Sequence, residues 1–320
     1  MIVDMTEWVL KRRVHHKRRG FMLACWALAL LIPSIGSVHA RSIAFTFDDG
    51  PDMSDRIGMT AAERNTAILA ALSAADVKSV LFVTRTDKDQ QRYALMRAWG
   101  DAGHLVGNHT ATHPDFGAIR TSLPSFEAEL LACEAAIHTL PGFTKLFRFP
   151  YLKEGNTREK RDGFRVFLKS SGYRQGRVSI DTSDWYYNQR LRERLMRDPT
   201  ADRTAYRDAY LKHLYDRAVY YDDLSQRVLG RSVKHVMLMH HNLINALFLA
   251  DVIRMFEREG WQRIDAAAAF DDPVYEMQPD ILPAGESILW ALAKQQGIAG
   301  LRWPGEDAPY EKPLLDALGL

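Results

Sequence analysis

Short apolar runs recur along the chain, and each is followed by a polar cluster. The clearest run, 43–47, is followed by Asp48, Asp49, Gly50 and Pro51. Because Gly and Pro end a strand sharply, the pattern predicts a buried strand that ends in two adjacent carboxylates. Two like charges this close are unfavourable unless positive charge lies beside them. A bound cation would supply that charge, and a solvated Asp-Asp-Gly turn is the alternative.

The segments between the apolar runs have helical periodicity or helix-start signals. Further strands are predicted at 79–83, 104–107, 145–149, 177–180, 235–239 and 261–264, and helices at 60–75, 89–103, 125–140, 161–171 and 246–260, with at least one more helix within 189–230. Alternating strands and helices indicate a parallel sheet or a barrel. In a barrel of parallel strands the carboxyl ends of the strands surround one mouth. The polar clusters are therefore expected to meet there.

The first 40 residues have the pattern of an export signal. A basic cluster at 11–19 precedes an uncharged run at 21–38, and small residues lead to Ala40. This order is typical of a secretory signal cleaved after Ala40, and it predicts an exported protein, periplasmic or extracellular. An uncleaved membrane anchor is the alternative, because the run is nearly long enough to span a bilayer. Only in that case is contact with a membrane expected.

The net charge of the chain without residues 1–40 differs in sign from that of the whole chain. Residues 1–40 carry a net charge of +4 and the whole chain +2, so the remainder carries about −2. That excludes the basic excess that nucleic-acid binding requires. Cys133 would be the only cysteine left, so an apolar core rather than a disulfide must provide stability. One domain is expected at 41–275, with 276–320 as an extension packed on it. The oligomeric state has no signal in the sequence.

Two histidines suit a metal site near the carboxylate pair. His109 and His113 are four residues apart, a spacing that places both rings on one face of a helical turn. Such a pair alone is more often incidental. Together with one Asp, two His make the three protein ligands of an open, zinc-type catalytic site. Cobalt, nickel or manganese would suit the same ligands. His104 lies inside a predicted strand and is interpreted as structural.

Other strand ends also carry candidate residues. Arg148 could fix one carboxylate and keep it ionised, or form a salt bridge without catalytic use. Trp185, directly after Asp184, suits the face of a sugar ring or plain core packing. His240 follows an apolar strand, where a histidine would be unusual as a core filler. Its neighbour His241 is expected to point elsewhere.

Taken in order, these residues form five motifs. They are TFDDGP at 46–51, H-x-x-x-H at 109–113, R-x-P-Y at 148–151, D-x-x-D-W at 181–185 and L-x-H at 238–240. Their order resembles the polysaccharide deacetylase family, the NodB-like family-4 carbohydrate esterases, over about residues 42–275. The resemblance implies a distorted (β/α) barrel with fewer than eight full units. It also implies an exported, metal-dependent hydrolase that acts on a carbon–nitrogen bond.

The resemblance implies a metal centre with a general base beside it. Asp49, His109 and His113 match the metal ligands of the family. Asp48 matches the general base, a role that spacing alone does not separate from that of its neighbour. Arg148 matches the residue that orients this base. The implied cofactor is a divalent metal, with zinc as the first candidate.

The remaining motifs imply an acid and a pocket for the acetyl group. His240 matches the catalytic histidine, which acts as the acid, and Asp184 matches its partner. Tyr151 matches the position whose backbone N–H helps to hold the oxyanion. Trp185 and Leu238 match hydrophobic positions that line the acetyl pocket.

The function expected from these motifs is removal of N-acetyl groups from an N-acetylglucosamine-containing polysaccharide. The sequence leaves open whether the partner is peptidoglycan, a chitin-like polymer or a biofilm glycan. Two alternatives remain. One is a catalytically silent glycan-binding protein on the same barrel, and the other is a hydrolase of a non-sugar amide.

Overall fold

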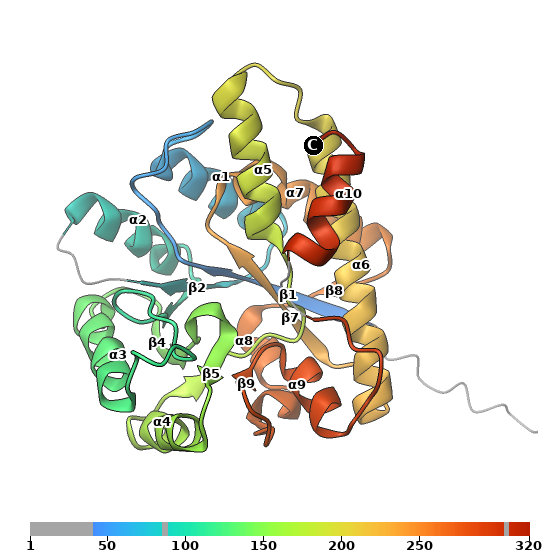
Figure 1. Ribbon diagram of the computed structural model, residues 1–320. Helices are drawn as coiled ribbons and strands as arrows, with labels where there is room; N and C mark the ends of the chain where they lie inside the picture. Colours follow the sequence, from blue (N-terminus) through green and yellow to red (C-terminus); the bar gives the residue numbers. More distant parts are fainter. Residues whose placement is uncertain (1–40, 85–88, 304–306) are drawn as a thin grey trace, which may run out of the picture. The chain divides into compact units, whose positions relative to one another are not determined.

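The computed structural model describes residues 41–84, 89–303 and 307–320, so the predicted signal segment at 1–40 lies outside the described residues. A parallel sheet forms the centre (Figure 1). Its strands are β1 (Ser42–Asp48), β2 (Val80–Val83), β3 (Leu105–Asn108), β4 (Phe143–Phe147), β6 (Arg174–Gln175), β7 (Lys234–His240) and β8 (Gln262–Arg263). The strand order is β6-β4-β3-β2-β1-β7, with β8 beside β1. Every residue of β1 is buried, which fits an apolar strand covered on both faces.

One segment connects the two outer strands of this sheet. β6 pairs with β4 where Arg174 faces Leu146. A few residues later, Ile180 forms a parallel bridge with Met237 of β7. Because the same segment pairs with both edges, the sheet curls into a small barrel. The predicted distorted (β/α) barrel is confirmed, but the strand expected at 177–180 is reduced to a bridge.

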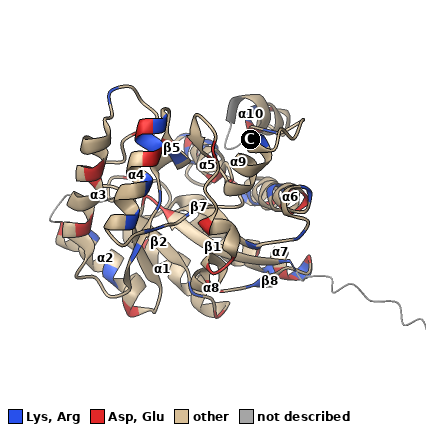
Figure 2. Ribbon diagram, turned by 90° about the horizontal axis from the view of Figure 1, so that it is seen from below, with Lys and Arg blue, Asp and Glu red and all other residues tan. Residues whose placement is uncertain are grey.

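Helices cover the outside of the sheet (Figure 1). They are α1 (Ala61–Ala74), α2 (Gln90–Asp101), α3 (Leu123–Ile137), α4 (Arg158–Ser170), α5 (Asp184–Arg197), α6 (Thr204–Leu229), α7 (Leu243–Arg258) and α8 (Ala266–Phe270). α1 begins with the capping box of Thr60 and Glu63, a device that stabilises a helix by about 1 kcal/mol. It buries Ile68 and Leu72 in the core. Lys, Arg, Asp and Glu are interspersed along the helices (Figure 2).

Residues after 275 contact the barrel through a strand and a helix. β9 (Ala284–Gly285) pairs antiparallel with β5 (Lys153–Gly155), which follows the short helical turn η1 (Pro150–Leu152). α9 (Ile288–Gln295) packs against α6, and its Ile288 and Leu289 are buried. A further turn, Asp307–Glu311, leads into α10 (Lys312–Ala317). Among the described residues, no helix is both long and apolar enough to cross a membrane.

Candidate active site

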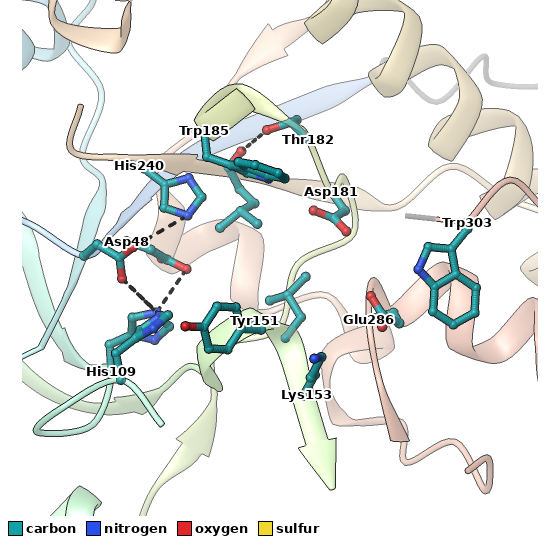
Figure 3. Close-up of a pocket in the computed structure, with 14 residues that line it drawn as sticks. Asp48, His109, Tyr151, Lys153, Asp181, Thr182, Trp185, His240, Glu286 and Trp303 are labelled. Carbon is teal, nitrogen blue, oxygen red and sulfur yellow. Dashed lines mark hydrogen bonds and ion pairs between the residues drawn. The ribbon is translucent and has the colours of Figure 1, made fainter. Parts of the chain in front are cut away.

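A pocket of about 670 Å³ lies at the carboxyl ends of the barrel strands (Figure 3). β1 ends at Asp48 and β7 ends at His240, and both residues line the pocket. The complete lining is Asp48, Asp49, His109, His113, Tyr151, Leu152, Lys153, Asp181, Thr182, Trp185, Leu238, His240, Glu286 and Trp303. Residues from distant parts of the sequence therefore meet at one mouth, as the strand-end pattern predicts.

Asp49, His109 and His113 form a cluster that could hold a metal ion. One ligand atom from each lies within 4.8 Å of the others. Asp49 Oδ1 is 3.4 Å from His109 Nε2 and 3.3 Å from His113 Nε2. The two histidines converge through a loop, so the helical turn expected from their spacing is wrong. Thr110 and His113 have φ values of 71° and 58°, and these left-handed residues turn the chain after β3.

The hydrogen bonds around the cluster fit a bound cation. His109 Nδ1 lies 2.8 Å from the carbonyl oxygen of Arg148, which can only accept, so Nδ1 carries the proton. In the neutral imidazole, His109 Nε2 then presents a lone pair toward Asp49 Oδ1. That oxygen is buried and has no hydrogen-bond donor among the described residues. Acceptor facing acceptor in a buried place is costly, and a divalent metal between the atoms would satisfy both.

His113 is also suited to a metal. Burial, and next the neighbouring His109, lower the pKa of the His113 imidazole to about 4. The ring is therefore neutral at neutral pH and offers a lone pair. Two neutral imidazoles and one carboxylate are a common ligand set of catalytic zinc sites with an open position.

Asp48 lies beside this cluster and is fixed by Arg148. Arg148 Nη1 donates to Asp48 Oδ1 at 2.6 Å and to Thr46 Oγ1 at 2.9 Å. Arg148 Nε donates to the carbonyl oxygen of Gly176 at 2.7 Å. The other carboxylate oxygen of Asp48 is 3.7 Å from His109 Nε2. A buried, guanidinium-bound carboxylate thus faces the metal-type cluster and is available as a proton acceptor.

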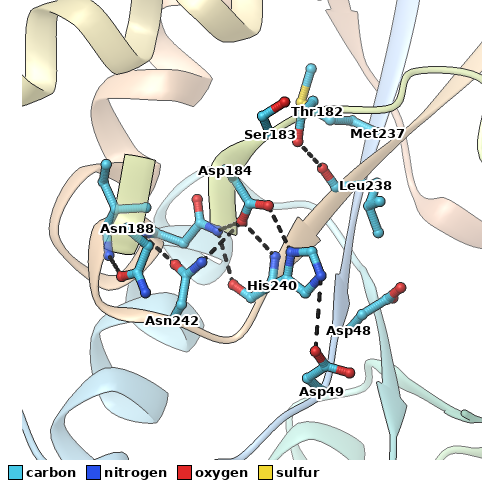
Figure 4. Close-up of polar contacts among 12 residues, drawn as sticks. Asp48, Asp49, Thr182, Ser183, Asp184, Asn188, Met237, Leu238, His240 and Asn242 are labelled. Atoms are coloured by element: carbon cyan, nitrogen blue, oxygen red, sulfur yellow. Dashed lines mark hydrogen bonds and ion pairs between the residues drawn. The ribbon is translucent and has the colours of Figure 1, made fainter. Parts of the chain in front are cut away.

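His240 lies at the end of β7, the strand next to β1 of Asp48, and is backed by Asp184 (Figure 4). Its Nδ1 donates to Asp184 Oδ1 at 2.6 Å, and its Nε2 lies 3.9 Å from Asp49 Oδ2. Burial opposes a charge on His240, but the attraction of Asp184 outweighs it and raises the pKa of the imidazole to about 10. His240 therefore holds a proton at neutral pH with Nε2 aimed into the pocket, as a general acid requires.

Asp184 is wholly buried and is satisfied by other donors. The amides of Asn242 and Asn245 donate to Asp184 Oδ2 at 3.1 and 2.8 Å, and so does the backbone N–H of His240 at 2.8 Å. Sequence reasoning missed both asparagines because they lie at the start of an ordinary apolar helix. Thr46 was also missed, although it is the first residue of the TFDDGP motif.

The three residues expected to bind substrate all line the pocket. Tyr151 has a φ of 56°, and its ring packs on His113 with ring centres 4.5 Å apart. Trp185 is 38% exposed, so the alternative of plain core packing does not describe it. Leu238 lines the pocket from β7. The role proposed for the Tyr151 backbone N–H stays a prediction.

Two further histidines considered in the sequence lie outside the pocket lining. His104 precedes β3 instead of lying within a strand, and its Nδ1 accepts from the Ser79 backbone N–H at 3.0 Å. His241 turns away from the pocket, with its Nε2 3.1 Å from Asn65 Oδ1. Both imidazoles have a pKa lowered to about 4, chiefly by burial. These contacts agree with structural roles.

Six pocket residues had no assigned role in the sequence: Leu152, Lys153, Asp181, Thr182, Glu286 and Trp303. Asp181 belongs to the D-x-x-D-W motif, which could have identified it. Lys153, Glu286 and Trp303 belong to no motif, and the last two come from the extension after residue 275. Only the folded chain brings them to the pocket.

The fold is thus a small parallel (β/α) barrel, with Asp48, an Asp-His-His cluster and a His–Asp pair at its mouth. Residues 36–167 match the family model described as polysaccharide deacetylase. This match agrees with the family that the five motifs predict.

Individual relatives are more distant. A Bacillus cereus protein described as peptidoglycan-N-acetylglucosamine deacetylase is 26% identical over 151 residues, which cover 47% of this chain and 48% of that protein. The chain thus matches about half the length of this curated relative. The catalytic domain of peptidoglycan N-acetylglucosamine deacetylase from Eubacterium rectale has a TM-score of 0.50 at 19% identity, covering 70% of this chain and 88% of that one. This likeness shows a shared fold. The chitin deacetylase of the fungal pathogen Colletotrichum lindemuthianum has a TM-score of 0.49 at 20% identity, covering 72% and 87%.

Proposed function

We propose that this protein is an exported, metal-dependent N-deacetylase that acts on an N-acetylglucosamine-containing polysaccharide. The observation that supports this proposal best is that three features meet at the mouth of the barrel. These are the Asp-His-His cluster, the Asp48–Arg148 pair and the His240–Asp184 pair. Export is supported by the N-terminal sequence pattern alone.

The reaction breaks the C–N bond of the acetamido group and forms a C–O bond from water. A divalent metal held by Asp49, His109 and His113, with zinc as the first candidate, would polarise the substrate carbonyl and make water more acidic. Asp48, paired with Arg148, would take the proton from the attacking water. His240 would give its Nε2 proton to the leaving nitrogen, because an amine leaves poorly unless protonated. The products are acetate and an amino sugar.

The direct test is acetate release by the full mature chain. The protein is stripped with a chelator and then supplied with zinc, cobalt, nickel or manganese. The substrates are acetylated chito-oligosaccharides, peptidoglycan fragments and simple acetamides. We expect release from the sugar substrates only after metal is restored. Peptidoglycan fragments come first in the panel, because two similar proteins are described as peptidoglycan deacetylases.

The same panel separates the alternatives. Glycan binding without acetate release under any metal would favour a silent binding protein. Release from simple acetamides but not from sugars would favour a non-sugar amide hydrolase. Export is tested separately by N-terminal sequencing of the protein from the producing cells, where a start at Arg41 is expected and a start at Met1 contradicts cleavage.

A further inference from the structure

The pocket has a second end that the family's motifs do not account for. We define the outer end as Lys153, Asp181, Glu286 and Trp303. In Figure 3 Lys153, Glu286 and Trp303 lie on the side away from His109 and His240. Glu286 and Trp303 come from beyond residue 167, where the family match ends. The outer end is therefore built in part by the extension of this chain.

Trp303 is held in place although its ring is partly open to solvent. The indole N–H of buried Trp290 donates to the carbonyl oxygen of Arg302 at 2.9 Å. The Arg302 backbone N–H donates to the Tyr220 hydroxyl at 3.0 Å. The rings of Trp290 and Trp303 meet edge to face, with ring centres 5.0 Å apart. Trp303 still keeps 42% of its surface exposed. A fixed aromatic ring is thus presented to the pocket.

Glu286 is held by the pairing of β5 with β9. Its backbone N–H donates to the carbonyl oxygen of Leu152 at 2.9 Å. Glu286 and Leu152 have φ values of 69° and 55°, which cost non-glycine residues about 1–2 kcal/mol each. Such residues persist where the surrounding structure enforces them, and they cluster at ligand sites. The pairing also brings Lys153 of β5 to the same wall of the pocket.

The pocket is larger than an acetamido group requires. Its volume of about 670 Å³ lies within the range of about 300–1,000 Å³ that encloses a drug-sized ligand. A pyranose ring has apolar C–H faces and a rim of hydroxyl groups. An open indole matches the face, while a carboxylate accepts from hydroxyls and an ammonium donates to them. Trp303, Glu286 and Lys153 supply these three groups.

We propose that the outer end is a subsite for a second sugar ring of the same polymer, which stacks on Trp303 and hydrogen-bonds to Glu286 and Lys153. The proposal rests on the proposed function and narrows the substrate class. The preferred substrate is an oligomer long enough to reach from the Asp-His-His cluster to Trp303, rather than a single acetylated sugar.

The test compares N-acetylglucosamine oligomers of increasing length on the metal-reconstituted full chain. In the wild type, kcat/KM rises when the oligomer becomes long enough to reach Trp303. Trp303→Ala lowers kcat/KM on the long oligomers by about tenfold and leaves the shortest active oligomer unaffected. Trp303→Phe keeps most of the rise in kcat/KM with oligomer length, since a phenyl ring still stacks on a sugar. Glu286→Gln shows a smaller loss of the same kind. Val166→Ala, an exposed position on α4 outside the pocket lining, is the control and behaves as wild type.

A binding measurement decides the question independently of turnover. Calorimetry with the longest oligomer compares two variants, Asp48→Asn and the double variant that also carries Trp303→Ala. The double variant is expected to bind the oligomer about tenfold more weakly. Equal affinities, or a length dependence unchanged by Trp303→Ala, would overturn the subsite. Absence of acetate release from every substrate would instead reject the proposed function, and the calorimetry would still decide the subsite.

Discussion

The two ends of the pocket differ in how deeply their residues are buried and in the contacts that hold them. At the inner end, Asp48, His109 and Asp184 are almost completely buried, and each is fixed by a second polar group. At the outer end, Trp303 is 42% exposed and offers surface rather than charge. Preorganised buried dipoles stabilise developing charge strongly because no water competes with them. The inner end is thus suited to chemistry and the outer end to holding a chain in place.

The difference extends to what supports each end. The inner residues sit at or just beyond the ends of barrel strands, so the core of the protein fixes them. The outer end depends on the short β5–β9 pair and on one buried ion cluster. In that cluster Glu154 of β5 accepts from Arg177 at 3.2 Å and from Arg165 at 3.1 Å. Damage at the inner end should therefore affect rate, and damage at the outer end should affect stability and binding.

The largest expected effect is loss of the metal-type cluster. Asp49→Ala or His113→Ala should lower kcat by about a thousandfold or more, since a catalytic metal contributes several kcal/mol to the barrier. Thermal unfolding should change little, and metal content measured by mass spectrometry should fall. His138→Ala, at the exposed histidine directly after α3, is the control. Normal turnover by either cluster variant would contradict the assignment.

Next in size is the partner of the histidine acid. Asp184→Asn removes the charge that keeps His240 protonated, so kcat should fall by about 10²- to 10⁴-fold, the range for general acid catalysis. The comparison variant is Asp208→Asn, whose carboxylate is exposed on α6. If Asp184→Asn keeps full kcat while metal content is unchanged, His240 is not the acid.

Loss of the buried carboxylate of Glu154, which supports the outer end, should lower the stability of the protein. Glu154→Gln leaves Arg165 and Arg177 short of a buried partner, so the free energy of unfolding at pH 7 should fall by about 3 kcal/mol. Urea titration measures this change. The matched control, Glu159→Gln at an exposed site, should lie within about 0.5 kcal/mol of wild type.

The same pair of proteins should also differ in pH dependence. Burial favours protonation of Glu154, but Arg177 and Arg165 outweigh it and lower the pKa of this carboxyl. A carboxyl with a depressed folded-state pKa contributes stability above its unfolded value of about 4.3, and this contribution is lost as pH falls through the folded value. The gap between wild type and Glu154→Gln should therefore narrow in acid. A gap that stays constant down to pH 3 would contradict an ionic role.

The smallest expected effect is at the middle of the pocket. Trp185→Ala should lower kcat/KM by about tenfold on short and long oligomers alike, because Trp185 borders the inner end. Trp303→Ala should act on long oligomers only. If kcat/KM depends on oligomer length in the same way in both variants, the two ends of the pocket do not have separate roles.

Much of the inner end could be predicted from sequence, because its residues directly follow apolar strands that are easy to recognise. The path between His109 and His113 could not, since the same spacing suits a helix and the left-handed Thr110 has no signature. Asn245 looks like any polar residue in the first turn of a helix. Trp303 of the outer end was out of reach, because its place depends on packing against Trp290 and on the hydrogen bond from Arg302 to Tyr220, which belong to no motif.

The strip of backbone that joins β4 to β7 has one more consequence. Its Gly176 carbonyl holds the guanidinium behind Asp48, and a few residues on, the same strip becomes the start of α5 and carries Asp184. A methyl group on Gly176 would come within 2.5 Å of the Phe82 ring, so a larger residue here would displace the ring or the strip. The proposed proton acceptor and proton donor thus depend on one short stretch of backbone, so a substitution that moves this stretch should disturb both.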